Sequence, residues 1–310
     1  MPLKSQFVLS GNVRDFQIQE HAPGVAAPAP LIAVLDAELQ SAGFQHVLVY
    51  EPVRGFRSAA VSPEAIKTDG VLLGELGLTP SEGSASAGPD LFADVLPRLV
   101  HRGGAPIALI VDFASRLVIR EDTLLESEQR LFTRAYVSSL EAQPRPFGAD
   151  ARPYFNNICW VVEKEVDLPD WLIIGNPRIR HIPVPKPDHR ARRAVAGAIL
   201  QAMPGALEPE SSSEIERAFV EATEGLLLSD MMAVAELGRA ENVEVTRISD
   251  AVRRYKLGVI EDPWKNLDRD RIRNGESFVS QRVRGQGHAV THMLDIIKRA
   301  VTGVGGAGRA

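Results

Sequence analysis

Residues 107–112, Ile-Ala-Leu-Ile-Val-Asp, are the stretch that decides the fold class of this chain. Five consecutive apolar residues predict a strand that is buried on both faces. Such strands are typical of parallel sheets whose two faces are covered by helices. The strand ends on a carboxylate, Asp112, and the next residue is aromatic, Phe113. The segment therefore predicts an α/β domain with an acidic side chain at the end of a buried strand.

Other segments extend this pattern in both directions along the chain. Short apolar runs predict strands at 7–10, 46–50 and 158–162. Helical spacing of apolar residues predicts helices at 31–43, 91–101 and 121–141. Buried strands that alternate with helices favour a parallel sheet.

Three segments read as irregular structure. The Pro/Ala-rich residues 22–30 are predicted to be a connector, and the small polar residues 79–89 a mobile loop. Residues 51–58, EPVRGFRS, follow a predicted strand, which is the position expected for a phosphate-binding loop. This segment has one glycine, Gly55, and no Lys-Ser or Lys-Thr pair. The pattern G-x-x-x-x-G-K-[ST] occurs nowhere in the 310 residues.

The character of the chain changes after Pro204-Gly205. Ser213 and Glu216 have the spacing of a capping box, and helical periodicity continues to about residue 258. A charged linker and a last helical stretch, 278–301, follow. We expect an α/β domain at 1–205, a small all-helical lid at 206–262, and a C-terminal segment at 263–310.

Composition excludes several functional classes. The formal net charge is −5, which gives no overall attraction to nucleic acid or to an anionic membrane. No apolar run approaches the ~20 residues that span a bilayer. The single cysteine, Cys159, lies in an apolar run and is expected to be an inert core thiol. We expect a cytoplasmic protein.

The order of these parts resembles an AAA+ ATPase, a fold of the P-loop NTPase type followed by a helical lid. Residues 107–112 are similar to the Walker B strand, which in that family ends Asp-Glu. Residues 167–192 are similar to the stretch that leads into the lid. The resemblance implies that Asp112 is the relic of a Mg²⁺-holding acid and that Phe113 replaces the acid that orients water. The strand at 158–162 continues Glu163-Lys164 and lacks the family's sensor asparagine.

A second resemblance covers residues 277–303. Val283, Arg284, Gly285 and Gln286 are similar to the V-x-G-Q segment at the entrance of a Clp-type AAA+ domain. In that family the segment packs on adenine. The resemblance implies the first module of a tandem Clp-type ATPase, with the chain ending at the threshold of the second domain. These four residues would contact adenine only in an intact second domain.

Together these features favour a non-catalytic assembly or regulatory module of a Clp-like ring ATPase. We expect no catalytic residue, no metal site and no cofactor for this chain, and ATP with Mg²⁺ for the intact protein. The expected partners are copies of itself in a ring, a neighbouring AAA+ domain, or another protein. His288 and His292 have the spacing of a zinc-protease pair, but Ala289 replaces the required glutamate. Two alternatives stay open: an adaptor on an inactive ATPase fold, and a weak ATPase with a non-standard phosphate site at 53–58.

Overall fold

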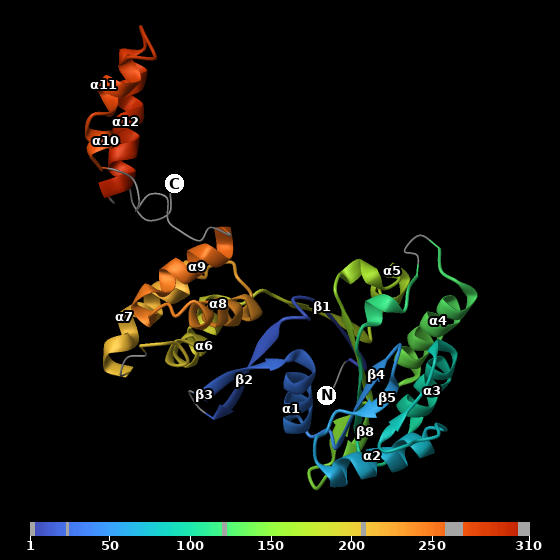
Figure 1. The fold of residues 1–310 in the computed structure, drawn as a ribbon. Helices are drawn as coiled ribbons and strands as arrows, with labels where there is room; N and C mark the ends of the chain where they lie inside the picture. The colour runs from blue at the N-terminus through green and yellow to red at the C-terminus, as the bar shows by residue number, and fades with distance from the viewer. Residues whose placement is uncertain (1–3, 23–24, 120–122, 206–208, 258–268, 303–310) are drawn as a thin grey trace.

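A seven-stranded, mostly parallel sheet lies at the centre of the α/β part in the computed structural model of this protein (Figure 1). The structure describes residues 4–22, 25–119, 123–205, 209–257 and 269–302. The strand order is β11-β1-β10-β7-β4-β5-β6. The parallel strands are β1 (Gln6–Gly11), β4 (His46–Glu51), β7 (Ile107–Val111), β10 (Asn157–Val162) and β11 (Ile179–Val184). The predicted α/β class is confirmed.

Helices cover both faces of this sheet (Figure 1). The α1 helix (Leu31–Ser41) lies on one face. The other face is covered by α2 (Pro63–Glu75), α3 (Pro89–His101), α4 (Glu126–Glu141) and α5 (Asp170–Ile173). The β7 strand shows the division: Ala108 and Ile110 join the core under α1, whereas Ile107, Leu109 and Val111 join the opposite core. All five are fully buried, which explains why this strand is apolar at every position.

Residues 25–30 of the Pro/Ala-rich segment are a strand, so the prediction of a connector at 22–30 is wrong there. The strand β3 (Val25–Pro30) pairs antiparallel with β2 (Phe16–Ala22) in a separate two-stranded sheet. Pro28 and Pro30 are two residues apart. Alternate N–H groups of an edge strand point away from its partner, so both prolines can sit at positions that donate no ladder bond.

Two further loop predictions, at 51–58 and 79–89, are corrected at the β5–β6 side of the seven-stranded sheet. Residues 51–58 form the turn and second strand of a hairpin, because β5 (Gly55–Ser58) pairs antiparallel with β4. Within 79–89, β6 (Ser84–Ala85) pairs with β5, and Ala85 is buried. Gly55 allows this pairing: its φ is +79°, and a Cβ there would lie 2.3 Å from the Ala85 carbonyl oxygen. The backbone of residues 55–58 is thus used in the sheet.

Four helices after β11 pack on one another. They are α6 (His189–Gln201), α7 (Pro209–Ala222), α8 (Leu228–Ala240) and α9 (Ile248–Leu257). Their shared core contains Leu200, Phe219, Met231 and Ile248. This helical cluster begins with α6, before residue 205. We call helices α6–α9 the helical domain.

The last described part of the chain contains two short helices, α10 (Arg269–Arg273) and α11 (Gly275–Ser280), and the longer helix α12 (Gly287–Thr302). Val290 and Leu294 of α12 are buried, and a Cβ on Gly275 would lie 2.7 Å from Leu294 Cδ2. The apolar side of α12 is therefore partly covered by α11, while Met293 and Ile296 are exposed. The linker at 258–268 and the glycine-rich end at 303–310 lie outside the described residues.

Candidate functional site at the carboxyl edge of the sheet

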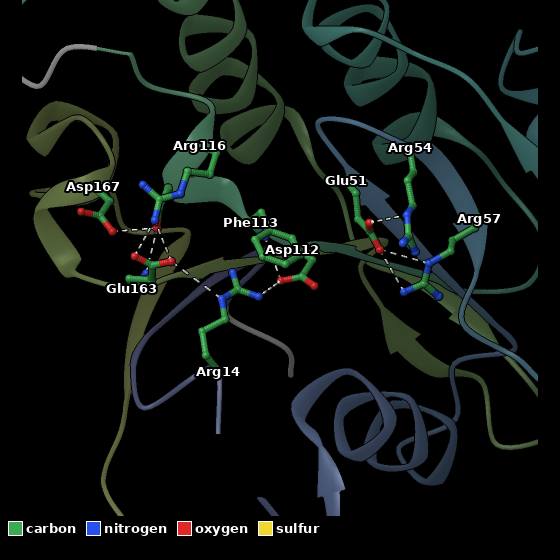
Figure 2. A network of polar contacts seen from close by, with 10 residues as sticks. Arg14, Glu51, Arg54, Arg57, Asp112, Phe113, Arg116, Glu163 and Asp167 are labelled. Atoms are coloured by element: carbon green, nitrogen blue, oxygen red, sulfur yellow. Dashed lines mark hydrogen bonds and ion pairs between the residues drawn. The ribbon is translucent and has the colours of Figure 1, made fainter. Parts of the chain in front are cut away.

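The carboxyl ends of the parallel strands carry a row of acidic side chains. Glu51 ends β4, Asp112 follows β7, and Glu163 follows β10. Because the strands are parallel, the three carboxylates lie at the same edge (Figure 2). The loop after β1, residues 11–15, lies at this edge as well.

The connections that follow the parallel strands lie on opposite faces of the sheet on the two sides of the gap between β1 and β10. The chain leaves β1 through the β2–β3 hairpin to α1 on one face, whereas β10 and β7 lead to α5 and α4 on the opposite face. Such a switch point opens a crevice at the carboxyl edge, where open α/β sheets bind their ligands. This topology makes the 11–15 loop and Asp112 the candidate site.

Arg14 binds Asp112 directly. Its Nη1 lies 2.6 Å from Asp112 Oδ1, and its Nε lies 3.9 Å from Glu163 Oε1. The Asp112 side chain is 9% exposed and that of Arg14 is 34% exposed. The guanidinium carbon also lies 3.8 Å from the centroid of the Phe113 ring. Figure 2 shows Arg14 between Asp112, Phe113 and Glu163.

Phe113 has a definite structural role at this point. Its φ is +53°, in the left-handed region that a bulky residue rarely adopts. Its backbone N–H donates to Asp112 Oδ1 at 2.8 Å, so the Asp112 carboxylate caps the turn after β7. The ring then forms a platform for the Arg14 cation. Phe113 thus helps to hold an internal ion pair.

The other strand-end acids also have arginine partners. Arg116 Nη2 lies 2.9 Å from Glu163 Oε2, and Arg57 Nη2 lies 3.2 Å from Glu51 Oε1. Across the described ranges there is no group of three or more His, Cys, Asp or Glu side chains that could hold a metal ion. The edge is therefore neutralised by side chains of the chain itself.

Asp15 links this loop to the helical domain. Its carboxylate accepts hydrogen bonds from the backbone N–H groups of Leu228, at 2.9 Å, and Ser229, at 3.0 Å, in the first turn of α8. Asn12 Nδ2 lies 3.3 Å from the same carboxylate. Burial raises the pKa of Asp15, but the Ser229 and Leu228 hydrogen bonds outweigh this effect and leave the pKa below its ordinary value.

The open space beside the ion pair is small. A cavity of about 290 Å³ is lined by Val13, Arg14, Asp15, Phe16, Pro30, Leu31, Ile32, Asp112, Phe113 and Val161. Ligand pockets usually occupy about 300–1,000 Å³, so this space lies at the lower limit.

A Ser-His-Glu arrangement is formed by Ser10 of β1, His181 of β11 and Glu165 in the short helical turn after β10. Ser10 Oγ is 2.7 Å from His181 Nε2, and His181 Nδ1 is 3.4 Å from Glu165 Oε1. Acyl transfer also needs donors for the oxyanion. The amides of Gly11 and Asn12 instead donate to the carbonyls of Glu163 and Val184. Ser10 is only 6% exposed, so this group braces β1 against β11.

The structure separates the predicted site residues. Asp112 lies at the switch point, whereas Val283, Arg284, Gly285 and Gln286 are exposed between α11 and α12. Arg14 and Asp15 were not predicted as site residues, because the phosphate-loop position was expected after the strand at 46–50. In the fold, it is the loop after β1 that lies beside Asp112.

The parallel sheet, the acid at the end of β7 and the helical domain after β11 define an AAA+-type module. A family described as "AAA+ chaperone, N-terminal Rossmann-like domain" matches residues 2–185, more than half of the chain. The chain therefore belongs to this family.

Two solved structures are remotely similar. The FIGL-1 AAA domain is 12% identical to this chain, with a TM-score of 0.41. The match covers 91% of this chain and 78% of the FIGL-1 chain. A chain of the E. coli MS115-1 HORMA:CdnC:Trip13 complex is 12% identical, with a TM-score of 0.47. The match covers 82% of this chain and 74% of the chain in that complex. A comparison with curated protein sequences finds no significant match. In the part of the chain that the structure describes, no helix is long and apolar enough to cross a membrane.

Proposed function

We propose that this chain is a non-catalytic AAA+ module that serves assembly and regulation in a Clp-like, ATP-dependent ring protein. The contact of Arg14 with Asp112 carries the proposal. In active relatives the acid at this position helps to hold Mg²⁺. Here a guanidinium is bound to Asp112 Oδ1 and is supported by the Phe113 ring. A metal ion would have to displace this cation from a largely buried carboxylate.

The same proposal covers the domain division and the cofactors. Because α6 packs with α7–α9, we place the start of the lid near residue 186 and not at 206. We propose that residues 263–310 lead into a second AAA+ domain, in which Val283–Gln286 would contact adenine. ATP and Mg²⁺ would then act in the intact protein, and this module would need neither.

Exposed apolar side chains on α4 and α5 favour a protein contact. Leu140 is 44% exposed, Trp171 40% and Ile174 72%. The rings of Tyr136 and Trp171 lie 6.2 Å apart and connect the two helices. We call Tyr136, Val137, Leu140, Trp171 and Ile174 the α4–α5 patch, and propose that it contacts a second copy of the chain. An adaptor would use the same patch for a different protein.

We expect no binding of Mg-ATP tighter than about 100 µM in isothermal titration calorimetry. The reason is that Arg14 is ion-paired with Asp112 and that the sequence has no P-loop lysine to neutralise the β/γ phosphates. ATP hydrolysis should equal that of buffer, and Asp112→Ala should leave it unchanged. A micromolar dissociation constant, or turnover that disappears in Asp112→Ala, would refute the non-catalytic function.

We expect concentration-dependent self-association that depends on the α4–α5 patch. Leu140→Ser combined with Ile174→Ser should weaken it at least about tenfold, because burial of each apolar side chain contributes about 1.5–3 kcal/mol. Sedimentation velocity measures the change. Val61→Ser with Val71→Ser is the control, since these exposed residues lie before and on α2. A chain that stays monomeric at every concentration would favour the adaptor.

A further inference from the structure

Arg14 and Asp15 are neighbours in the chain, but their side chains bind opposite parts of the molecule. Arg14 binds Asp112 at the sheet edge, 98 residues away. Asp15 accepts two backbone hydrogen bonds at the start of α8, from residues more than 200 positions away. One short loop therefore connects the α/β domain to the helical domain through two charged groups.

The charges of the two side chains suit their partners. Asp112 is an anion at the end of a buried strand, and the loop supplies a cation to it. The first N–H groups of α8 form the positive end of a 13-residue helix, and the loop supplies an anion to them. Asp15 is only 6% exposed, so its two hydrogen bonds to α8 are shielded from water.

The segments that flank these residues also hold the loop in place. Gln17 Nε2 donates to the Asn12 carbonyl at 2.8 Å and to the Asp15 carbonyl at 3.3 Å. The following hairpin reaches the helical domain, where Phe16 and Ile18 pack against its core. β2 contacts α8, and β3 contacts α6.

From this arrangement we infer that Arg14 and Asp15 act as a built-in strut that holds the helical domain in one fixed position on the α/β domain. The strut needs no nucleotide, because the loop itself supplies a cation to Asp112 and an anion to the α8 N-terminus. The strut fixes only the arrangement of the two domains, whether or not the chain binds ATP.

The test measures the distance between the domains by pulsed electron spin resonance on the full chain. Spin labels are attached at Gln129→Cys on α4 and Arg239→Cys on α8, both exposed positions. The native Cys159 is buried, and burial raises the pKa of its thiol to about 12, so it stays unlabelled. Hydrogen exchange at residues 228–231 is measured on the same variants.

We expect one narrow distance distribution for the wild-type chain without nucleotide. Asp15→Ala should broaden this distance distribution. It should also raise the rate of amide hydrogen exchange at residues 228–231 on the order of tenfold, which corresponds to about 1.4 kcal/mol. Asp15→Asn keeps one acceptor oxygen and should have a smaller effect. Arg14→Ala should also broaden the distribution, because the loop loses its hold on Asp112.

Asp188→Ala is the matched control. Asp188 caps its own helix, α6, through the Ala191 amide and does not bridge the two domains, so its loss should leave the distribution narrow. Circular dichroism confirms that each variant is folded. An unchanged distribution and unchanged exchange in folded Asp15→Ala and Asp15→Asn would overturn the strut, as would an Arg14→Ala variant identical to wild type. These comparisons contain no nucleotide, so their failure leaves the calorimetric test of the proposed function untouched.

Discussion

Replacement of Trp160 by alanine is expected to lower the free energy of unfolding by about 3–5 kcal/mol. Trp160 is fully buried on β10, with its ring centroid 6.0 Å from that of Phe92 and 6.2 Å from that of Phe132. The substitution leaves a cavity between the sheet and α3 and α4. It also removes the donor that lies 3.0 Å from Gln6 Oε1, a buried acceptor.

Urea denaturation followed by far-UV circular dichroism measures this loss. Trp171→Ala is the control, because Trp171 is 40% exposed and its removal should cost less than about 1 kcal/mol. Equal losses for the two tryptophans would show that the core between the sheet and α3–α4 is misplaced.

Asn156 is the second position with a large expected effect. Its Oδ1 accepts from the Ile107 amide at 3.0 Å, and its Nδ2 donates to the carbonyls of Leu99 and Arg102 at 2.7 and 2.9 Å. The side chain therefore joins the end of α3 to the start of β7. Asn156→Ala removes all three hydrogen bonds and takes the side-chain acceptor from the buried Ile107 amide, and should cost about 2–4 kcal/mol.

Asn156→Asp should cost at least as much at neutral pH, because a carboxylate oxygen would face two carbonyl oxygens. This environment should raise the folded-state pKa of the new carboxyl, so stability should recover as the pH falls through that value. Denaturant midpoints between pH 5 and 8 measure the trend. Gln45→Glu, an exposed amide-to-acid change, should show little loss. If Asn156→Asp were as stable as wild type at pH 8, the three hydrogen bonds would be wrong.

Local patterns in the sequence were enough to predict the fold class and four of the five parallel strands, β1, β4, β7 and β10, but not β11. Residues 107–111 are apolar at every position because both faces of β7 are buried, and this pattern can be read from the segment alone. The end of the strand at Asp112 was likewise readable. The α2 helix was missed, although Ser62 followed by Pro63 is a helix-start signal.

Weak sequence patterns led to wrong predictions for two strands, β3 and β6. The β3 strand contains two prolines, and β6 has two residues, so neither has the periodicity that marks a strand. Both are held by pairing with a partner strand, which single-segment patterns do not record.

The sequence by itself determined that this is an α/β chain with a strand-terminal acid, an aromatic residue after it, and no P-loop motif. Only the tertiary structure decided which loop lies beside that acid. Strand order depends on how crossovers pack over the whole sheet, and the local period of each strand is the same in any order. For that reason Arg14 and Asp15 read as ordinary loop residues in the sequence. Their roles follow from β1 lying between β10 and β11, which places them between Asp112 and α8.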